Sequence, residues 1–113
     1  MIEIKNETEK VILVGVSLSD QDDTKESLEE LKDLVSTAAG AVVVGTLIQK
    51  RENIHPGTYV GKGKIEELKS MIWELRATGI VCDDELSPAQ MKNLQDELDV
   101  KVMDRTLIIL DIF

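Results

Sequence analysis

The feature that most constrains the fold of this chain is a regular alternation of two sequence patterns. Short runs rich in valine and isoleucine are separated by longer stretches in which apolar residues recur with a helical period. The short runs are KVILVGV (10–16), AVVVGTLI (41–48), GIVCDD (79–84) and VKVMD (100–104). Such runs are typical of strands that are buried on both faces of a parallel sheet.

Three amphipathic stretches fill the intervals and predict helices. For the first helix we predict Asp23 as the N-cap and Gly40 as the end. The second ends near Gly79, and the third opens with a capping box in which Ser87 and Gln90 are paired. The three apolar stripes consist of Leu28, Leu31, Leu34, Val35 and Ala38, then Ile65, Leu68, Ile72 and Leu75, then Met91, Leu94 and Leu98.

Strands that alternate with single helices predict an α/β fold with right-handed crossovers. We therefore expect a four-stranded parallel sheet with helices on both faces, formed by one domain over residues 10–113, with residues 1–9 as a flexible N-terminus. The last segment, RTLIILDIF (105–113), is apolar at six of nine positions. Either it packs on the sheet as a last helix, or it is the truncated start of a helix in a longer chain, and we favour truncation.

Charge is distributed unevenly along the sequence. The chain has 113 residues and a net charge of −9, which argues against a surface that binds nucleic acid over its whole extent. The segment QKRENIHPGTYVGKGK (49–64) is the exception, because its only acid is Glu52 while its basic residues are Lys50, Arg51, Lys62 and Lys64. A contact with an anionic partner would therefore be local to this segment.

In an open parallel sheet, ligands gather at the carboxyl ends of the strands. The loops expected at that edge are 17–23, 49–64, 83–87 and 104–106. This arrangement places the basic segment beside the acidic cluster Asp83, Asp84 and Glu85.

The glycines of the basic segment have two interpretations. GTYVGKGK is similar to the phosphate-binding GxxxxGK[ST] motif, but it is one residue short before Gly61 and has Gly63 in place of the metal-binding hydroxyl. We therefore expect no nucleoside triphosphate site. A weaker anion site remains, formed by the amides after Gly61 with Lys62 and Lys64 nearby. The alternative is that Gly61 and Gly63 only permit a tight entry into the helix.

The remaining candidates are weaker. Asp83, Asp84 and Glu85 could hold Mg²⁺ with help from Asp104, but we favour Asp83 or Asp84 as a cap for backbone amides before the Ser87 helix. The lone cysteine, Cys82, fits a buried apolar role and a reducing compartment. Trp73 lies off the helical stripe and is expected to pack against the sheet edge rather than to mark a contact surface. No catalytic set assembles from these residues.

Four blocks of the sequence resemble the N-terminal domain of HflX-type GTPases. They are AVVVGTLIQKR (41–51), TYVGKGKIEEL (58–68), DDELSPAQMKNLQDEL (83–98) and VKVMDRTLIILDIF (100–113), and they occur in the order of that family. The resemblance implies that a helical hairpin and a GTPase domain follow in the complete protein. GTP and Mg²⁺ would be bound there, and none of the family's nucleotide-binding residues matches a position in this chain.

The resemblance also implies a cytoplasmic, ribosome-associated role, because this family associates with the large ribosomal subunit and splits ribosomes. The expected partners are the rRNA of that subunit and the protein's own helical and GTPase domains, with no membrane span. We expect RNA or anion contacts at Lys50, Arg51, Gly61, Lys62, Gly63 and Lys64. A non-catalytic nucleotide-binding or anion-binding module, or a structural buttress for the GTPase domain, is the alternative. The apolar C-terminal segment could also drive dimerisation of this chain.

Overall fold

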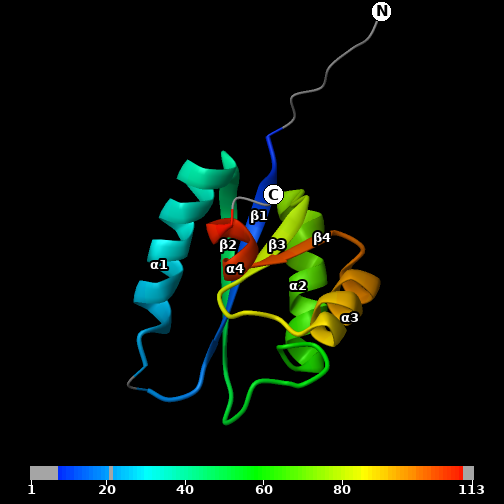
Figure 1. The fold of residues 1–113 in the computed structure, drawn as a ribbon. Coiled ribbons are helices and arrows are strands. Elements are labelled where there is room, and N and C mark those ends of the chain that lie inside the picture. The colour runs from blue at the N-terminus through cyan, green and yellow to red at the C-terminus, as the bar shows by residue number, and fades with distance from the viewer. Residues whose placement is uncertain (1–7, 21, 111–113) are drawn as a thin grey trace, which may run out of the picture.

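The fold is an α/β sandwich built on a four-stranded, all-parallel sheet with the strand order β2-β1-β3-β4 (Figure 1). The coordinates are a computed structural model that describes residues 8–20 and 22–110. The strands are β1 (Lys10–Ser17), β2 (Val42–Lys50), β3 (Gly79–Cys82) and β4 (Lys101–Asp104). The predicted fold class is confirmed.

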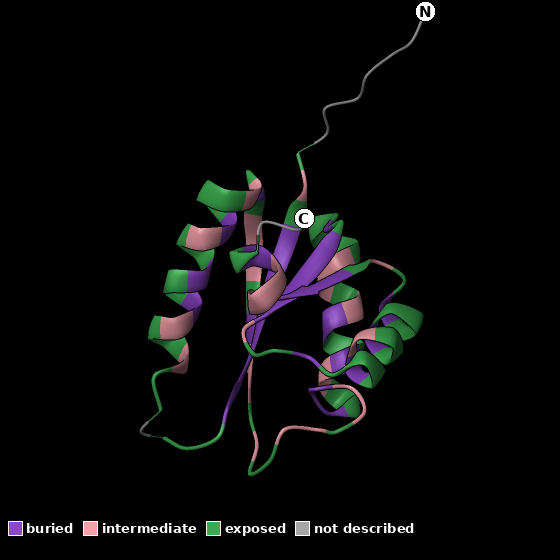
Figure 2. Ribbon diagram, viewed as in Figure 1, coloured by how far each residue is buried: buried purple, intermediate pink, exposed green. Residues whose placement is uncertain are grey.

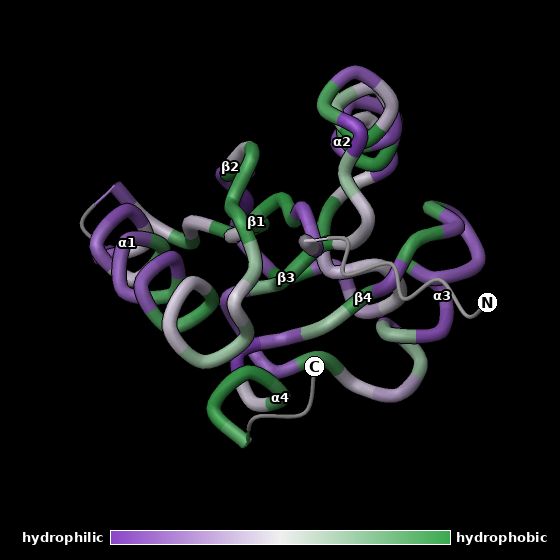
Figure 3. The backbone as a smooth tube through the Cα atoms, turned by 90° about the horizontal axis from the view of Figure 1, so that it is seen from above, coloured by the Kyte–Doolittle hydropathy of each residue, from purple (hydrophilic) through white to green (hydrophobic). Residues whose placement is uncertain are grey.

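The helices cover both faces of the sheet, as expected. They are α1 (Thr24–Leu34), which continues into the π-helical turn η1 (Val35–Ala39), α2 (Lys62–Leu75), α3 (Pro88–Leu98) and the short α4 (Arg105–Ile109). Viewed along the strands, α1 and α4 lie on one face of the sheet, and α2 and α3 lie on the other (Figure 3).

Each face of the sheet has its own apolar core, because side chains alternate between faces along a strand. Burial follows this layering, with buried strands and helices that are buried along one side only (Figure 2). Towards α2 and α3 the core includes Ile12, Val14, Leu68, Ile80 and Leu94. Towards α1 and α4 it includes Val11, Leu13, Leu31, Val81 and Ile108.

Two local predictions, on Ala38 and on the burial of β2, are corrected by the structure, and one, on Gly40, is confirmed. Ala38 is exposed and Ala39 packs on the core instead, because the wider π-helical turn η1 rotates the last residues of the stripe. Strand β2 is not buried on both faces, because it is the edge of the sheet, and Val42 is 50% exposed there. Gly40 ends the helix with a left-handed backbone, as predicted.

The structure does not describe the two ends of the chain completely. Residues 1–7 and 111–113 lie outside the described residues, so the expectations for them stay predictions. Glu9 already lies against the sheet, since its carbonyl oxygen accepts from the Val42 amide at 2.9 Å. At the other end, Ile108 is buried while Ile109 and Leu110 are exposed. Dimerisation through this apolar segment stays a prediction. Among the described helices, none is both long and apolar enough to cross a membrane.

Candidate functional site

The carboxyl ends of all four strands meet at one rim of the sheet, since every strand pair is parallel. This is the lower rim in Figure 1, where the connections that follow β1 and β2 lie side by side. The Arg51 amide donates to the Ser17 carbonyl oxygen at 3.0 Å, which ties the start of the basic segment to the end of β1. The predicted gathering of loops at this rim is confirmed.

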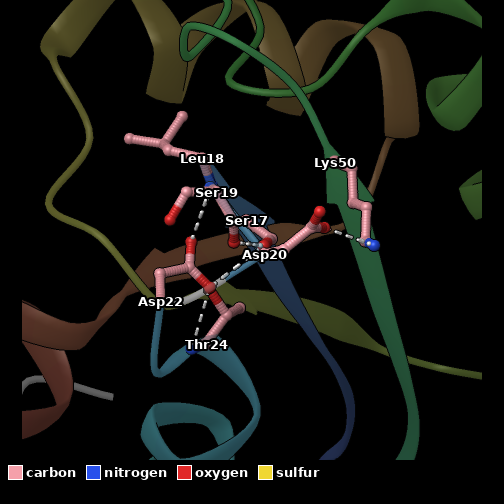
Figure 4. Close-up of polar contacts among 7 residues, drawn as sticks. All are labelled: Ser17, Leu18, Ser19, Asp20, Asp22, Thr24 and Lys50. Atoms are coloured by element: carbon pink, nitrogen blue, oxygen red, sulfur yellow. Dashed lines mark hydrogen bonds and ion pairs between the residues drawn. The ribbon is translucent and has the colours of Figure 1, made fainter.

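The loop after β1 is held by the carboxylate of Asp22 (Figure 4). Its Oδ2 accepts from the Leu18 amide at 2.6 Å, and its Oδ1 accepts from the hydroxyls of Ser17 at 3.0 Å and Thr24 at 2.8 Å. The hydrogen bond from Thr24 is the largest cause that lowers the pKa of Asp22 to about 2, with further help from Leu18 and Ser17. Asp23 is the N-cap residue of α1, as predicted, but its side chain makes no capping hydrogen bond, and Asp22 Oδ1 accepts from the Thr24 amide at 3.3 Å.

Lys50, the first predicted contact residue, reaches across to this loop. Its Nζ lies 2.9 Å from Asp20 Oδ1, and both side chains are exposed (Figure 4). The hydrogen bond and charge of Asp20 raise the pKa of Lys50 above its usual value. A cavity of about 390 Å³ opens beside this ion pair, between the loop after β1, the start of α1 and the end of β2.

The middle of the basic segment is folded back on itself and anchored. His55 and Tyr59 form an antiparallel bridge, and His55 Nδ1 accepts from the amides of Gly57 at 3.0 Å and Thr58 at 3.1 Å. Tyr59 is buried and adopts a left-handed backbone with φ of 67°. Its hydroxyl donates to Asp84 Oδ2 at 2.6 Å, and burial, followed by this hydrogen bond, raises its pKa well above the usual value.

Helix α3 holds the same loop from a second side. Gln90 Nε2 donates to the His55 carbonyl oxygen at 2.9 Å, and Asn93 Nδ2 donates to the Gly57 carbonyl oxygen at 2.9 Å. Gln90 also completes the predicted capping box with Ser87. The loop is thus fixed by side chains that are distant in the sequence.

The two ends of the basic segment are brought together. The Gly61 amide donates to Gln49 Oε1 at 2.7 Å. A Cβ at Gly61 would lie 2.5 Å from Arg51 Nη1 and 3.2 Å from Gln49 Nε2, so a larger residue would require the ends of these two side chains to shift. This close approach is compatible with Gly61 as a tight entry into the helix, whereas Gly63 has no neighbour within 4 Å of its Cβ position.

The last two basic residues lie on the first turn of α2. Lys62 is exposed, and it makes no ion pair within the described part of the chain. Lys64 Nζ lies 2.8 Å from Glu67 Oε2. Arg51, at the other end of the segment, donates from Nε to the Asn53 carbonyl oxygen at 2.9 Å.

The neighbouring acids have structural partners rather than a metal geometry. Asp83 accepts from Arg105 Nη1 at 2.6 Å, and Asp84 accepts from Tyr59. The cap before α3 is supplied by Asp104, whose Oδ2 accepts from the Leu86 amide at 2.9 Å, so the assignment of that cap to Asp83 or Asp84 was wrong. Among the described residues, no three or more His, Cys, Asp or Glu side chains lie together so as to hold a metal ion.

The prediction for Cys82 agrees with the structure, whereas the prediction for Trp73 does not. Cys82 is buried, and burial followed by the charge of Asp104 raises the pKa of its thiol well above the usual value, which fits an inert apolar role. Trp73 is 84% exposed, so the expectation that it packs against the sheet edge was wrong.

Tyr59, Asp22 and Arg105 are the residues of the rim that sequence reasoning missed. Arg105 links three elements, because its Nη1 donates to Asp83 and also to Ser27 Oγ at 2.9 Å, while Nη2 lies 3.1 Å from Glu30 Oε2. The partners of Arg105 and Tyr59 lie more than twenty residues away in the sequence, so no local pattern points to these two residues, whereas the partners of Asp22 are local.

A profile of one known family matches most of the sequence. The family is described as GTP-binding GTPase N-terminal, and the match covers residues 25–113. The chain belongs to this family. The resemblance read from the four sequence blocks is thereby confirmed.

Curated relatives and solved structures agree with this assignment to the N-terminal domain of HflX-type GTPases. The GTPase HflX of Lacrimispora saccharolytica is 67% identical over 113 residues, which are 100% of this chain and 26% of that protein. The GTPase HflX of Escherichia coli is 37% identical over 105 residues, 93% of this chain and 24% of that protein. The chain thus spans about a quarter of the length of these relatives.

A solved structure with the same fold is that of a GTP-binding protein from the archaeon Sulfolobus solfataricus in complex with GDP. It superposes with a TM-score of 0.64 and 25% identity over 91% of this chain and 30% of that chain. This HflX-type N-terminal domain therefore corresponds to the first part of longer GTP-binding proteins.

Proposed function

We propose that this domain contacts the RNA of the large ribosomal subunit through the basic surface formed by Lys50, Arg51, Lys62 and Lys64. It would act in the cytoplasm as the N-terminal part of a GTP-binding protein that splits ribosomes. GTP and Mg²⁺ would be bound by the GTPase domain of that longer protein, which would pack against this domain together with its helical part.

The observation that carries this proposal is the joining of the two ends of the basic segment. Gln49 Oε1 accepts from the Gly61 amide at 2.7 Å, and the Arg51 guanidinium lies against Gly61. Arg51 thereby lies beside the start of α2, whose first turn carries Lys62 and Lys64, and Lys50 lies next to Arg51 at the same carboxyl-end rim. Phosphate contacts of this kind position a protein on RNA without reading its sequence.

The ion pairs of the basic surface are compatible with this role. Lys50 pairs with Asp20 in a largely exposed ion pair, and Lys64 pairs with Glu67 in one that is partly exposed. Exposed ion pairs contribute little to stability, so an RNA phosphate can replace the carboxylate as the partner. The distant acids of the chain are screened beyond about 8 Å at physiological salt.

A matched pair of charge reversals in the full-length protein tests the proposal. Lys50→Glu with Lys62→Glu should weaken binding to purified large subunits by at least about tenfold. It should also lower the salt slope of log K by roughly 0.7–0.9 for each phosphate that the domain no longer neutralises. The control is Lys10→Glu with Lys101→Glu, two lysines at the opposite, amino-end rim. Equal binding by both variants, with the fold intact, would show that the basic surface is not part of the contact with the large subunit.

The second candidate function is a non-catalytic anion site at the start of α2. It is favoured by Gly63, whose surroundings are open, and by the exposed Lys62 beside it. The amide of Gly61 is already used by Gln49, which leaves the amides of the first turn as donors. Titration of GTP and ATP against this chain, followed by amide shifts, distinguishes the candidates. Saturable shifts at residues 62–64 would favour the anion site.

A further inference from the structure

The open edge of β2 has backbone groups available for pairing. β2 is the last strand of the sheet, with α1 on one face and α2 on the other (Figure 3). The Arg51 amide points to β1, where it donates to the Ser17 carbonyl oxygen. Because backbone groups alternate in direction along a strand, those of Thr46, Ile48 and Lys50 point away from β1, to the open side.

A bulge limits the part of this edge that can pair. Val11 is opposite Val43 and Ile12 is opposite Gly45, so Val44 is an extra residue in β2. Bulges on edge strands oppose pairing with a further strand. From Thr46 to Lys50, however, the register with β1 is regular, and this half of the edge is free of that defect.

A groove runs beside this regular half, between β2 and α1. It consists of two adjoining cavities of about 440 Å³ and 390 Å³, which share Lys25, Glu26 and Ile48. Apolar side chains of Leu13, Leu28 and Ile48 line its inner part. The charged side chains along it are predominantly acidic, namely Asp20, Asp22, Asp23, Glu26 and Glu29 against Lys25, Lys32 and Lys50.

We infer that the β2 edge from Thr46 to Lys50, with the groove beside it, is a docking site for an extended cationic segment of another polypeptide. The segment adds to the sheet as a fifth strand. Its backbone pairs with the outward groups of Thr46, Ile48 and Lys50, which is recognition by strand addition. Apolar side chains at alternate positions lie over Leu28 and Ile48, and lysine or arginine side chains meet the acids of the groove.

The charge of the site selects this occupant over an acidic segment or a nucleic acid. Lys50, one of the basic residues of the groove, is already paired with Asp20 at 2.9 Å. Glu26 and Glu29 are exposed along α1 and face solvent beside the open edge. This site adjoins the proposed RNA contact and shares Lys50 with it, but it uses the backbone of β2 and the side chains of α1 rather than the lysine side chains.

The probe for this docking site is a seven-residue peptide of alternating lysine and valine with blocked ends. Titration into the 113-residue chain should give saturable amide shifts and slower hydrogen exchange at Thr46, Ile48 and Lys50. A peptide of alternating glutamate and valine has a similar strand preference and the opposite charge. It should bind at least about tenfold more weakly.

Two variants separate the backbone and charge contributions. Thr46→Pro removes an outward N–H without removing a bond to β1, a position where edge strands tolerate proline, and it should weaken the lysine peptide at least about tenfold. Glu26→Lys with Glu29→Lys should weaken the lysine peptide similarly and strengthen the glutamate peptide, and this test holds even where the proline variant does not fold. The control is Glu74→Lys with Glu85→Lys, two exposed acids away from the groove, which should leave both affinities unchanged.

Three results would overturn the inference. The first is absence of saturable binding by the lysine peptide, and the second is binding whose shifts lie elsewhere on the chain. The third is self-association in analytical ultracentrifugation that Thr46→Pro abolishes, because the edge would then pair with a second copy of this chain.

Discussion

The two loops that follow β1 and β2 lie at the same rim, yet they are held in different ways. The loop after β1 is organised by Asp22, whose partners Ser17, Leu18 and Thr24 are all within five residues of it. The loop after β2 is organised from a distance. Tyr59 bonds to Asp84, 25 residues away, and Gly57 bonds to Asn93, 36 residues away.

This contrast indicates which of the two loops depends on the packed fold. A carboxylate that satisfies neighbouring amides needs only a short stretch of chain, and it shapes a turn without placing it against other elements. Contacts from α3 and from Asp84, just after β3, place the loop after β2 relative to the sheet, and they form only when the whole domain is folded. We therefore expect substitutions in the loop after β2 to cost more stability.

The largest expected effect comes from Tyr59→Ala. The ring is 1% exposed, so its removal leaves a cavity, and we expect a loss of about 3–5 kcal/mol of unfolding free energy. Urea denaturation measures it. Tyr59→Phe keeps the ring and loses only the bond to Asp84, so it should cost about 1–2 kcal/mol. Equal losses in the two variants would show that the ring's packing does not hold the loop.

A smaller loss is expected for Gln90→Ala, which removes the side-chain half of the α3 capping box, where Gln90 Oε1 accepts from the Ser87 amide, and the bond to the His55 carbonyl oxygen. Its expected cost is about 1–2 kcal/mol. Gln90→Glu keeps an acceptor for the Ser87 amide but cannot donate to His55. Hydrogen exchange at Tyr59 should therefore accelerate in the glutamate variant, while the exchange of α3 amides stays slow. Unchanged exchange at Tyr59 would show that α3 does not hold this loop.

Asp22→Asn tests the locally held loop through its pH dependence. The native pKa of about 2 lies below the ordinary 3.8, so the folded state binds fewer protons than the unfolded state between these values. The contribution of Asp22 is thus fully present above pH 3.8 and is lost as the pH falls towards 2. The stability difference between wild type and Asp22→Asn should shrink over this window in urea melts. A stability difference that does not change with pH would contradict the claim that the ionised carboxylate of Asp22 is the acceptor that stabilises this loop.

The smallest effect is expected for Lys50→Gln, which removes the exposed ion pair with Asp20. Because exposed pairs are screened and cost side-chain entropy, the midpoint of thermal unfolding should stay within experimental error. A clear drop in that midpoint would show that the two loops stabilise each other through this pair.

Much of the fold followed from local patterns. The four apolar runs, the three amphipathic stretches, the capping box of Ser87 and Gln90, and the helix end at Gly40 are all present in the structure. Asp23 is the N-cap of α1 as predicted, but Asp22 rather than Asp23 supplies the carboxylate that accepts from the nearby amides. The acid that caps the turn before α3 was assigned wrongly. Several acids stand near each of these positions, and local propensity does not distinguish between them.

The candidate site was predicted only in part. Its basic residues and its place at the carboxyl-end rim came from the sequence, because a parallel sheet gathers these loops at one edge. Its internal arrangement did not. The contact of Arg51 with Gly61 depends on how α2 starts beside the end of β2, and the anchor of Tyr59 depends on the position of Asp84 after β3.

Local sequence patterns set the type and order of the elements, and with them the parallel sheet, because hydrophobic periodicity and end signals are properties of neighbouring residues. The strand order, which leaves β2 at an open edge, and the partner of each acid at the rim followed only from the packing of the layers. Those outcomes depend on which surfaces meet when the layers pack. Residues far apart in the chain become neighbours only then.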